Sequence, residues 1–254
     1  MNAPITCAKA YLKVRHKAVR DAMKKLHLDA ILLTHQPDLM YLTNFTGDDS
    51  IGLIAGKDLC LVTDFRYKEQ AEIEAGWLKI YMRDGQMSHA LAAMLADLKP
   101  KRVGYEANYM AVGQLQALEV ALKEKGVQIE LVGLENVMTN IRKVKDDHEI
   151  DLIRNAVSVA EETFDAIRGE VKPGLSENYL AGLIILELRS RGADDASFPP
   201  IVAAGTNSSL PHYRPGEALV ARDQPLLFDF GAKYKGYCSD LTRTLLIGRV
   251  SDRM

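Results

Sequence analysis

The sequence predicts a mixed α/β chain made of two domains, and three observations carry this prediction. Helix-like and strand-like hydrophobic periods alternate up to about residue 140, with a hairpin signal among them. A long amphipathic helix pattern then begins near residue 146, and a strand-rich segment follows it. We therefore expect one domain over residues 1–142 and a second over residues 143–254, joined by a linker around residues 140–146.

In the first domain the pattern predicts a mixed sheet covered by helices. Gly56-Lys-Asp lies between two apolar runs and has the composition of a tight turn, so a hairpin is expected there. The expected helices span residues 9–26, 66–74, 88–98 and 112–125, and the expected strands span 29–34, 39–43, 51–55, 59–63, 78–82, 102–105 and 128–131.

The second domain opens with a helix-start signal. Asp146 with Glu149 three residues later is a capping-box pattern, and apolar residues then recur every three or four positions up to Gly169. This predicts one amphipathic helix of about six turns. A second helix is expected from Ser176 to Gly192, followed by strands at 198–203, 224–232 and 237–247.

Composition excludes several classes of protein. Hydrophobic residues make up 47% and charged residues 26%, which is the balance of a globular chain rather than a disordered or fibrous one. The 32 Lys+Arg and 34 Asp+Glu give a net charge of −2, so nothing favours nucleic acid or anionic lipid. The apolar runs are too short to cross a membrane, and the first residues do not resemble a signal peptide. The three cysteines form no Cys-x-x-Cys pair, which predicts a cytoplasmic location.

The most informative stretch is a predicted β-hairpin with two aspartates. Residues 233–236 form a polar tip between two apolar runs. If the turn is centred between the second and third of these four residues, Asp229 lies directly opposite Asp240. A glycine bulge would shift this pairing by one residue.

Facing carboxylates repel each other, and the repulsion needs relief. With Cβ atoms about 5 Å apart and an effective dielectric near 20, the cost is roughly 3 kcal/mol. Protonation of one carboxyl, surrounding basic residues or a divalent cation would each relieve it, and the cation is the simplest solution. Equally, one aspartate could be hydrogen-bonded in the core and the other solvated, so both interpretations stay open.

Other candidate residues are less specific. His212 lies in a turn-rich loop upstream of the hairpin, where it could hold a substrate carbonyl or simply be solvated. Cys238 is expected to be a buried, inert thiol, with a soft metal ligand as the alternative. The remaining histidines show no pattern of acidic partners and are interpreted as structural or surface residues: His16, His27, His35, His89 and His148.

These motifs resemble one family. Asp229-Phe-Gly-Ala and Gly236-Tyr-Cys-Ser-Asp240-Leu-Thr-Arg-Thr resemble the first two metal ligands of the Xaa-Pro aminopeptidases and dipeptidases (prolidases), which are pita-bread metallopeptidases. Leu210-Pro-His212 matches the place of their substrate-binding histidine. Residues 145–156 resemble the helix that opens their catalytic domain, and residues 41–47 and 63–67 are similar to the creatinase-type N-terminal domain. The resemblance implies an α/β (α+β) chain with a creatinase-like N-terminal mixed-sheet domain and the first half of a pita-bread catalytic domain.

The resemblance also implies an activity. Such enzymes are metal-dependent peptidases that hydrolyse the bond between an N-terminal residue and proline, using two divalent ions (Mn²⁺ first, Co²⁺ or Zn²⁺ as alternatives). Bound metal lowers the pKa of a water molecule and polarises the substrate carbonyl. By this resemblance Asp229 and Asp240 bind metal, with Asp240 bridging the ions, and His212 is the catalytic residue that assists the substrate. The expected partners are a peptide with proline at the second position and, at full length, a second copy of the chain.

One departure limits the expectation. The family's site also uses a histidine and two glutamates, and neither residue type follows Asp240 in this sequence. We therefore expect a chain whose C-terminal part is missing, inactive as a peptidase and poorly soluble by itself. The alternatives are a non-catalytic relative that serves as a binding or dimerisation module, and a hydrolase acting on another small amide.

Overall fold

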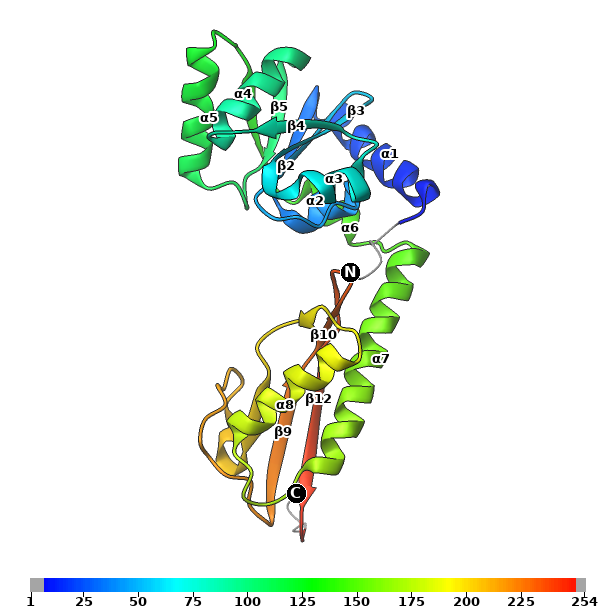
Figure 1. Cartoon of the computed structure of the whole chain (residues 1–254), viewed down its shortest axis with the longest axis vertical. Coiled ribbons are helices and arrows are strands. Elements are labelled where there is room, and N and C mark those ends of the chain that lie inside the picture. The colour runs from blue at the N-terminus through cyan, green and yellow to red at the C-terminus, as the bar shows by residue number, and fades with distance from the viewer. Residues whose placement is uncertain (1–6, 250–254) are drawn as a thin grey trace. The chain divides into compact units, whose positions relative to one another are not determined.

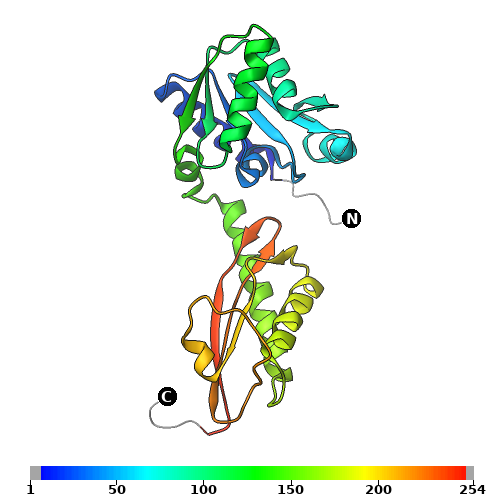
Figure 2. The same cartoon turned by 90° about the vertical axis from the view of Figure 1, so that its left-hand side faces the viewer.

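The computed structural model describes residues 7–249, and these divide into two compact units between Lys145 and Asp146 (Figures 1 and 2). The first unit therefore comprises residues 7–145 and the second unit residues 146–249. The expected boundary after residue 142 lies in the short segment that precedes this division.

The first unit is built on a six-stranded mixed sheet with the order β4-β3-β2-β1-β5-β6. Strands β1, β2 and β3 pair antiparallel, and β4, β5 and β6 are added in parallel. The strands are β1 Ala30–Leu33, β2 Ile51–Ala55, β3 Asp58–Asp64, β4 Lys79–Arg83, β5 Arg102–Glu106 and β6 Glu130–Leu134. The helices are α1 Lys9–Lys25, α2 Gln36–Thr43, α3 Lys68–Ala75, α4 Met87–Leu98, α5 Val112–Glu124 and α6 Val137–Arg142, with the 3₁₀ turn η1 Phe65–Tyr67.

Helices cover both faces of this sheet. Alternate residues of β1 point to opposite sides, so Ile31 joins one apolar core and Leu32 the other. Helices α1, α2, α3 and α6 contribute to the first core, while α4 and α5 contribute to the second. Burial on both sides explains why the central strands β1 and β2 are nearly continuous apolar runs.

The expected strand at residues 39–43 is wrong, because these residues belong to helix α2. Pro37 lies in the first turn, and Asn44 ends the helix with a left-handed φ of 64° while its N–H donates to Met40 O. Leu39 and Leu42 are fully buried. A short apolar run is too short for its period to distinguish a strand from a buried helix. Here the flanking Pro37 and Asn44 were the residues that indicated a helix.

The second unit packs two helices on a three-stranded antiparallel sheet. The sheet order is β12-β9-β8, and a second small sheet has the order β11-β10-β7. The helices are α7 Asp147–Glu170 and α8 Glu177–Ser190. The strands are β7 Asp195–Ala196, β8 Ile201–Ala204, β9 Gln224–Phe230, β10 Ala232–Tyr234, β11 Tyr237–Cys238 and β12 Leu241–Ile247, and the 3₁₀ turn η2 spans Gly205–Ser209.

The predicted helix starts of the second unit are confirmed. Asp146 Oδ1 accepts from Glu149 N at 3.0 Å and Glu149 Oε2 accepts from Asp146 N at 3.1 Å, which completes the capping box. Ser176 Oγ accepts from Tyr179 N at the start of α8. The helices pack on one sheet face through residues such as Phe164 and Phe228, whereas Thr242 on the opposite face is exposed.

Candidate functional site

The two aspartates lie near each other on the hairpin, but not in the expected register. Lys235 and Gly236 have φ values of 48° and 80°, which makes them the central pair of a two-residue turn. The turn is centred one residue later than expected, so Asp229 pairs with Thr242 and not with Asp240. The predicted direct opposition of the two carboxylates is therefore wrong.

Each of the two long strands expected here is interrupted where the chain passes between the β12-β9-β8 sheet and the β11-β10-β7 sheet. We call this place, at Gly231 and Ser239, the crossing point. The chain leaves the β12-β9-β8 sheet at Gly231 and returns to it after Ser239. A Cβ at Gly231 would collide with the carbonyl oxygen of Ser239, so only glycine allows this close approach. The buried Ser239 hydroxyl accepts from Ala232 N at 3.0 Å and donates to Ala156 O of α7 at 2.9 Å. These bonds attach the crossing point to the helix.

The aspartates flank this crossing point on the same side of the hairpin. Asp229 is half-buried in β9 and its Oδ1 accepts from Thr242 Oγ1 at 3.1 Å. Asp240 is exposed and immediately precedes β12. Because Leu241 is buried, Asp240 and Thr242 both face away from the core, as Asp229 does. Diagonal neighbours of this kind have Cβ atoms about 7 Å apart.

This geometry lowers the repulsion that sequence reasoning invoked. At about 7 Å and an effective dielectric near 20, two charges repel by roughly 2 kcal/mol, and solvent at Asp240 reduces this further. Asp229 has a hydroxyl donor and Asp240 is solvated, which is the arrangement of the non-metal interpretation. The carboxylate pair by itself therefore does not require a cation.

The donor set only partly fits a metal centre. Two carboxylates are suitable oxygen ligands for a hard divalent ion. In the described part of the chain, however, no group of three or more His, Cys, Asp or Glu side chains is placed to hold a metal ion. Since affinity follows the number and geometry of the ligands, residues 7–249 do not form a complete dinuclear centre.

No described bond links His212 to the aspartates. It is exposed in the loop between η2 and β9. Within residues 7–249, no hydrogen bond or ion pair joins its imidazole to Asp229 or Asp240. Its predicted role in substrate contact stays a prediction.

Glu177, which sequence reasoning missed, holds the loop that carries His212. Its side chain is fully buried at the start of α8. Its oxygens accept four hydrogen bonds of 2.7–3.0 Å, from Ala204 N, Asn207 Nδ2, Tyr213 Oη and Gly216 N. Burial alone would raise the pKa of Glu177, but these donors outweigh it and lower the pKa. Acidic residues are common in the first turn of a helix, so nothing in the sequence distinguishes Glu177 from them.

One expectation about another side chain is wrong. Cys238 is exposed rather than buried, because the short strand β11 is an edge of the β11-β10-β7 sheet. Two of the histidines that were interpreted as structural or surface residues have an acidic neighbour. His35 Nδ1 lies 2.8 Å from Asp38 Oδ2, and His89 Nε2 lies 3.4 Å from Glu124 Oε2.

Comparisons with known proteins agree with the two-unit organisation. The sequence model described as Metallopeptidase family M24 matches residues 151–254, and the one described as Creatinase/Prolidase N-terminal domain matches residues 15–144. The chain is 34% identical to "Uncharacterized peptidase YqhT" of Bacillus subtilis (strain 168) over 236 residues, which are 93% of this chain and 66% of that protein.

Solved structures with the same fold include peptidases specific for proline. An Xaa-Pro dipeptidase from Bacillus anthracis superimposes with a TM-score of 0.88 at 32% identity, over 95% of this chain and 67% of the other. An X-Pro aminopeptidase from Thermotoga maritima MSB8 superimposes with a TM-score of 0.83 at 30% identity, over 92% and 67%. The predicted fold, a creatinase-like domain followed by part of a pita-bread domain, is confirmed. The chain spans 64–66% of the length of the curated relatives that match it over most of its residues.

Proposed function

The chain belongs to the M24 metallopeptidase family and carries a creatinase/prolidase N-terminal domain, and from this we propose that its function is that of a metal-dependent Xaa-Pro peptidase. Its reaction would be hydrolysis of the bond between an N-terminal residue and proline. One observation carries the proposal: the segment that matches the peptidase family includes Asp229 and Asp240, two carboxylates on the same side of one hairpin. The relatives are named both as dipeptidases and as aminopeptidases, and either substrate length suits the proposal.

We assign the metal-binding role to the two aspartates and the substrate-binding role to His212. Asp240, which is exposed, would bridge two ions, and the half-buried Asp229 would hold one of them. Mn²⁺ is the proposed ion, because carboxylate oxygens suit it and the family resemblance places it first. With two carboxylates as the ligands in residues 7–249, we propose weak metal binding and no peptide turnover by these 254 residues alone.

The proposal extends to partners and location. The substrate is a peptide with proline at its second position, and a second copy of the chain is the proposed partner. In the part of the chain that the structure describes, no helix has the length and apolar character needed to span a bilayer. The proposed location is cytoplasmic, and the net charge of −2 favours neither a nucleic-acid nor a membrane partner.

Paramagnetic broadening by Mn²⁺ tests the metal assignment without requiring activity. Amide signals of the ¹⁵N-labelled chain are followed as MnCl₂ is added. Signals around residues 229–231 and 239–242 should broaden first, and the double variant Asp229→Asn/Asp240→Asn should lose this effect. Asp165→Asn is the matched control, because Asp165 is an exposed aspartate of α7 that forms an ion pair with Arg168.

Two results would contradict the proposal. Broadening that is unchanged in the double variant would place the ion elsewhere, and no local broadening in the wild type would favour a non-catalytic module. Hydrolysis of an Xaa-Pro peptide in the presence of Mn²⁺, lost in the double variant, would support the peptidase function but overturn the expected inactivity of this chain.

A further inference from the structure

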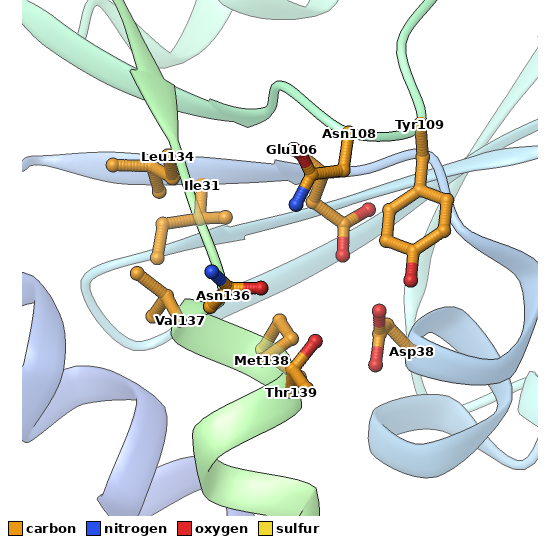
Figure 3. A pocket seen from close by; sticks show the side chains of 10 residues that line it. All are labelled: Ile31, Asp38, Glu106, Asn108, Tyr109, Leu134, Asn136, Val137, Met138 and Thr139. Atoms are coloured by element: carbon orange, nitrogen blue, oxygen red, sulfur yellow. The ribbon is translucent and has the colours of Figure 1, made fainter.

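A second pair of carboxylates lies in the first unit, far from the candidate metal ligands in the sequence. Asp38 of α2 and Glu106 at the end of β5 are only 1% and 6% exposed. Figure 3 shows both side chains directed into one small pocket, which residues of α6 also line. Two buried carboxyl groups at one point in a protein core need a physical explanation.

The two oxygens of Glu106 have different surroundings. Oε2 accepts from the backbone N–H groups of Thr34 at 2.6 Å and His35 at 2.8 Å, at the start of α2. Oε1 is buried and has no hydrogen-bond partner among the described residues. A buried polar atom without a partner is rare, and it is costly when it carries charge.

Asp38 has the partners of an ionised carboxylate. Its Oδ1 accepts from Arg142 Nη1 of α6 at 2.8 Å, and its Oδ2 lies 2.8 Å from His35 Nδ1. The carboxylate also lies within hydrogen-bonding range of the Glu106 side chain. Both groups are acceptors when ionised, so neither can satisfy the other without a proton between them.

The charged and titratable groups around the pair are few. Helix α2 contributes Asp38, and His35 is the N-cap residue just before it. Helix α6 contributes Arg142, and the loop after β5 contributes Tyr109, whose ring stacks on His35 with centroids 3.7 Å apart. The end of β1 contributes only the neutral Thr34. The remaining polar lining residues of the pocket are neutral: Asn108, Asn136 and Thr139.

We propose that Glu106 keeps a proton on Oε1 and donates it to Asp38, so that the pair is a buried proton-binding site that ties α6 to the sheet. With one proton shared, the pair carries a single negative charge, which Arg142 balances. The proton also gives Oε1 the partner that it otherwise lacks. When the proton leaves, two carboxylates compete for one arginine, and the attachment of α6 weakens.

The electrostatics agree with this arrangement. Burial raises the pKa of Glu106 to about 8, and the hydrogen bond and charge of Asp38 act in the same direction. The N–H groups of His35 and Thr34 act against this rise. The folded first unit therefore holds the proton at neutral pH.

The sign of the pH dependence follows from linkage. The pKa of Glu106 rises from an ordinary 4.5 in the unfolded chain to about 8 in the folded one. The stabilisation is complete below pH 4.5 and is lost as pH rises to about 8, because the unfolded chain releases the proton first. Over this interval the unfolding constant of the first unit should increase by up to about tenfold per pH unit.

Infrared spectroscopy of the full chain tests for the proton directly. Near pH 6, the folded wild type should show the C=O stretch of a protonated, buried carboxyl, and this band should disappear around pH 8. The variant Glu106→Gln should lack the band at every pH. The wild-type titration needs no variant, so the test holds even if Glu106→Gln does not fold. Absence of the band from the folded wild type near pH 6 would overturn the proposal.

Stability provides the second readout. In Glu106→Gln, the amide N–H can donate to Asp38 permanently, while its oxygen still accepts from Thr34 and His35. The urea midpoint of the first unit, followed by pulsed hydrogen exchange in β1 and β5, should fall with pH in the wild type and change little in the variant. The matched control is Glu130→Gln, which removes an exposed carboxylate of β6 and should keep the wild-type slope.

A metal ion is the competing occupant, and salt distinguishes it from a proton. At constant ionic strength, replacing choline chloride by NaCl or KCl should not move the urea midpoint if the site holds a proton. A selective increase with Na⁺ or K⁺ in the wild type that is absent from Glu106→Gln would assign the pocket to a metal cation and overturn the proposal.

Discussion

The two units each place two carboxylates near one another, and they relieve the resulting repulsion differently. Asp229 and Asp240 lie on the solvent side of a hairpin, so water and the Thr242 hydroxyl stabilise their charges. Asp38 and Glu106 are buried, and solvent cannot help them. The comparison shows that burial, more than proximity, decides whether a carboxylate pair must change its protonation.

The difference also bears on what each pair can bind. The exposed pair retains free oxygen lone pairs and room for an ion, which suits the proposed ligand role. In the buried pair, Arg142 and His35 already occupy the oxygens of Asp38. Among the described residues, Glu106 Oε1 is the oxygen of this pair that lacks a hydrogen-bond partner, and a proton is sufficient to satisfy it.

Gly231→Ala should have the largest effect on the exposed pair. The added Cβ would collide with the carbonyl oxygen of Ser239, and a backbone atom cannot move aside cheaply. The second unit should lose roughly 3 kcal/mol or more of stability, and Asp229 and Asp240 should separate. Urea unfolding followed on α7 and β9 by hydrogen exchange measures the loss.

The control for this substitution is Gly182→Ala in α8. Its Cβ would meet no atom within 4 Å, and alanine in a helix should stabilise the same unit by about 0.5–1 kcal/mol. If both variants unfold at the wild-type urea concentration, the close approach at Gly231 does not exist and the placement of the aspartates is wrong.

Asp38→Asn tests the buried pair. The change leaves the partly buried Arg142 without its carboxylate, so the first unit should lose about 2 kcal/mol. Loss of the Asp38 charge and hydrogen bond should also lower the pKa of Glu106, although burial still raises it. The pH-dependent decline in stability should therefore end at a lower pH than in the wild type.

Chemical denaturation of Asp38→Asn across pH measures both effects. Asp97→Asn is a suitable control, because Asp97 forms an exposed ion pair with Lys79 at the edge of the same sheet. An unchanged pH profile in Asp38→Asn would mean that Asp38 and Glu106 do not share a proton.

The sequence predicted one of these pairs and missed the other for a physical reason. Asp229 and Asp240 belong to one hairpin, where strand alternation and a short turn limit their possible positions. Even so, the turn is centred one residue later than expected, which moves the partner of Asp229 by two residues to Thr242. The sequence did not indicate this turn, because Lys235 adopts a positive φ that favours glycine or asparagine. A local pattern thus identified the pair but not its geometry.

The buried pair has no local pattern at all. Asp38 and Glu106 come from elements far apart in the chain, and only the parallel pairing of β1 with β5 brings the end of β5 to the start of α2. The same holds for Glu177, whose four donors come from the last residue of β8 and from the segment between β8 and β9. Hydrophobic periods predicted most helices and strands, but contacts between distant polar residues depend on the assembled fold.

Thr242→Val should have the smallest effect on stability, and it tests whether Asp229 and Asp240 are metal ligands. Valine keeps the shape and strand preference of threonine, and the lost hydrogen bond to Asp229 is solvated, so stability should change by less than about 0.5 kcal/mol. Asp229 would then lack its only described side-chain donor, and its oxygens would be more available to a cation. If the aspartates are metal ligands, Mn²⁺ should broaden the amide signals around Asp229 at an equal or lower concentration than in the wild type. If Thr242→Val instead abolishes the broadening, the hydroxyl is itself part of the metal site, and Asp229 and Asp240 alone do not account for binding.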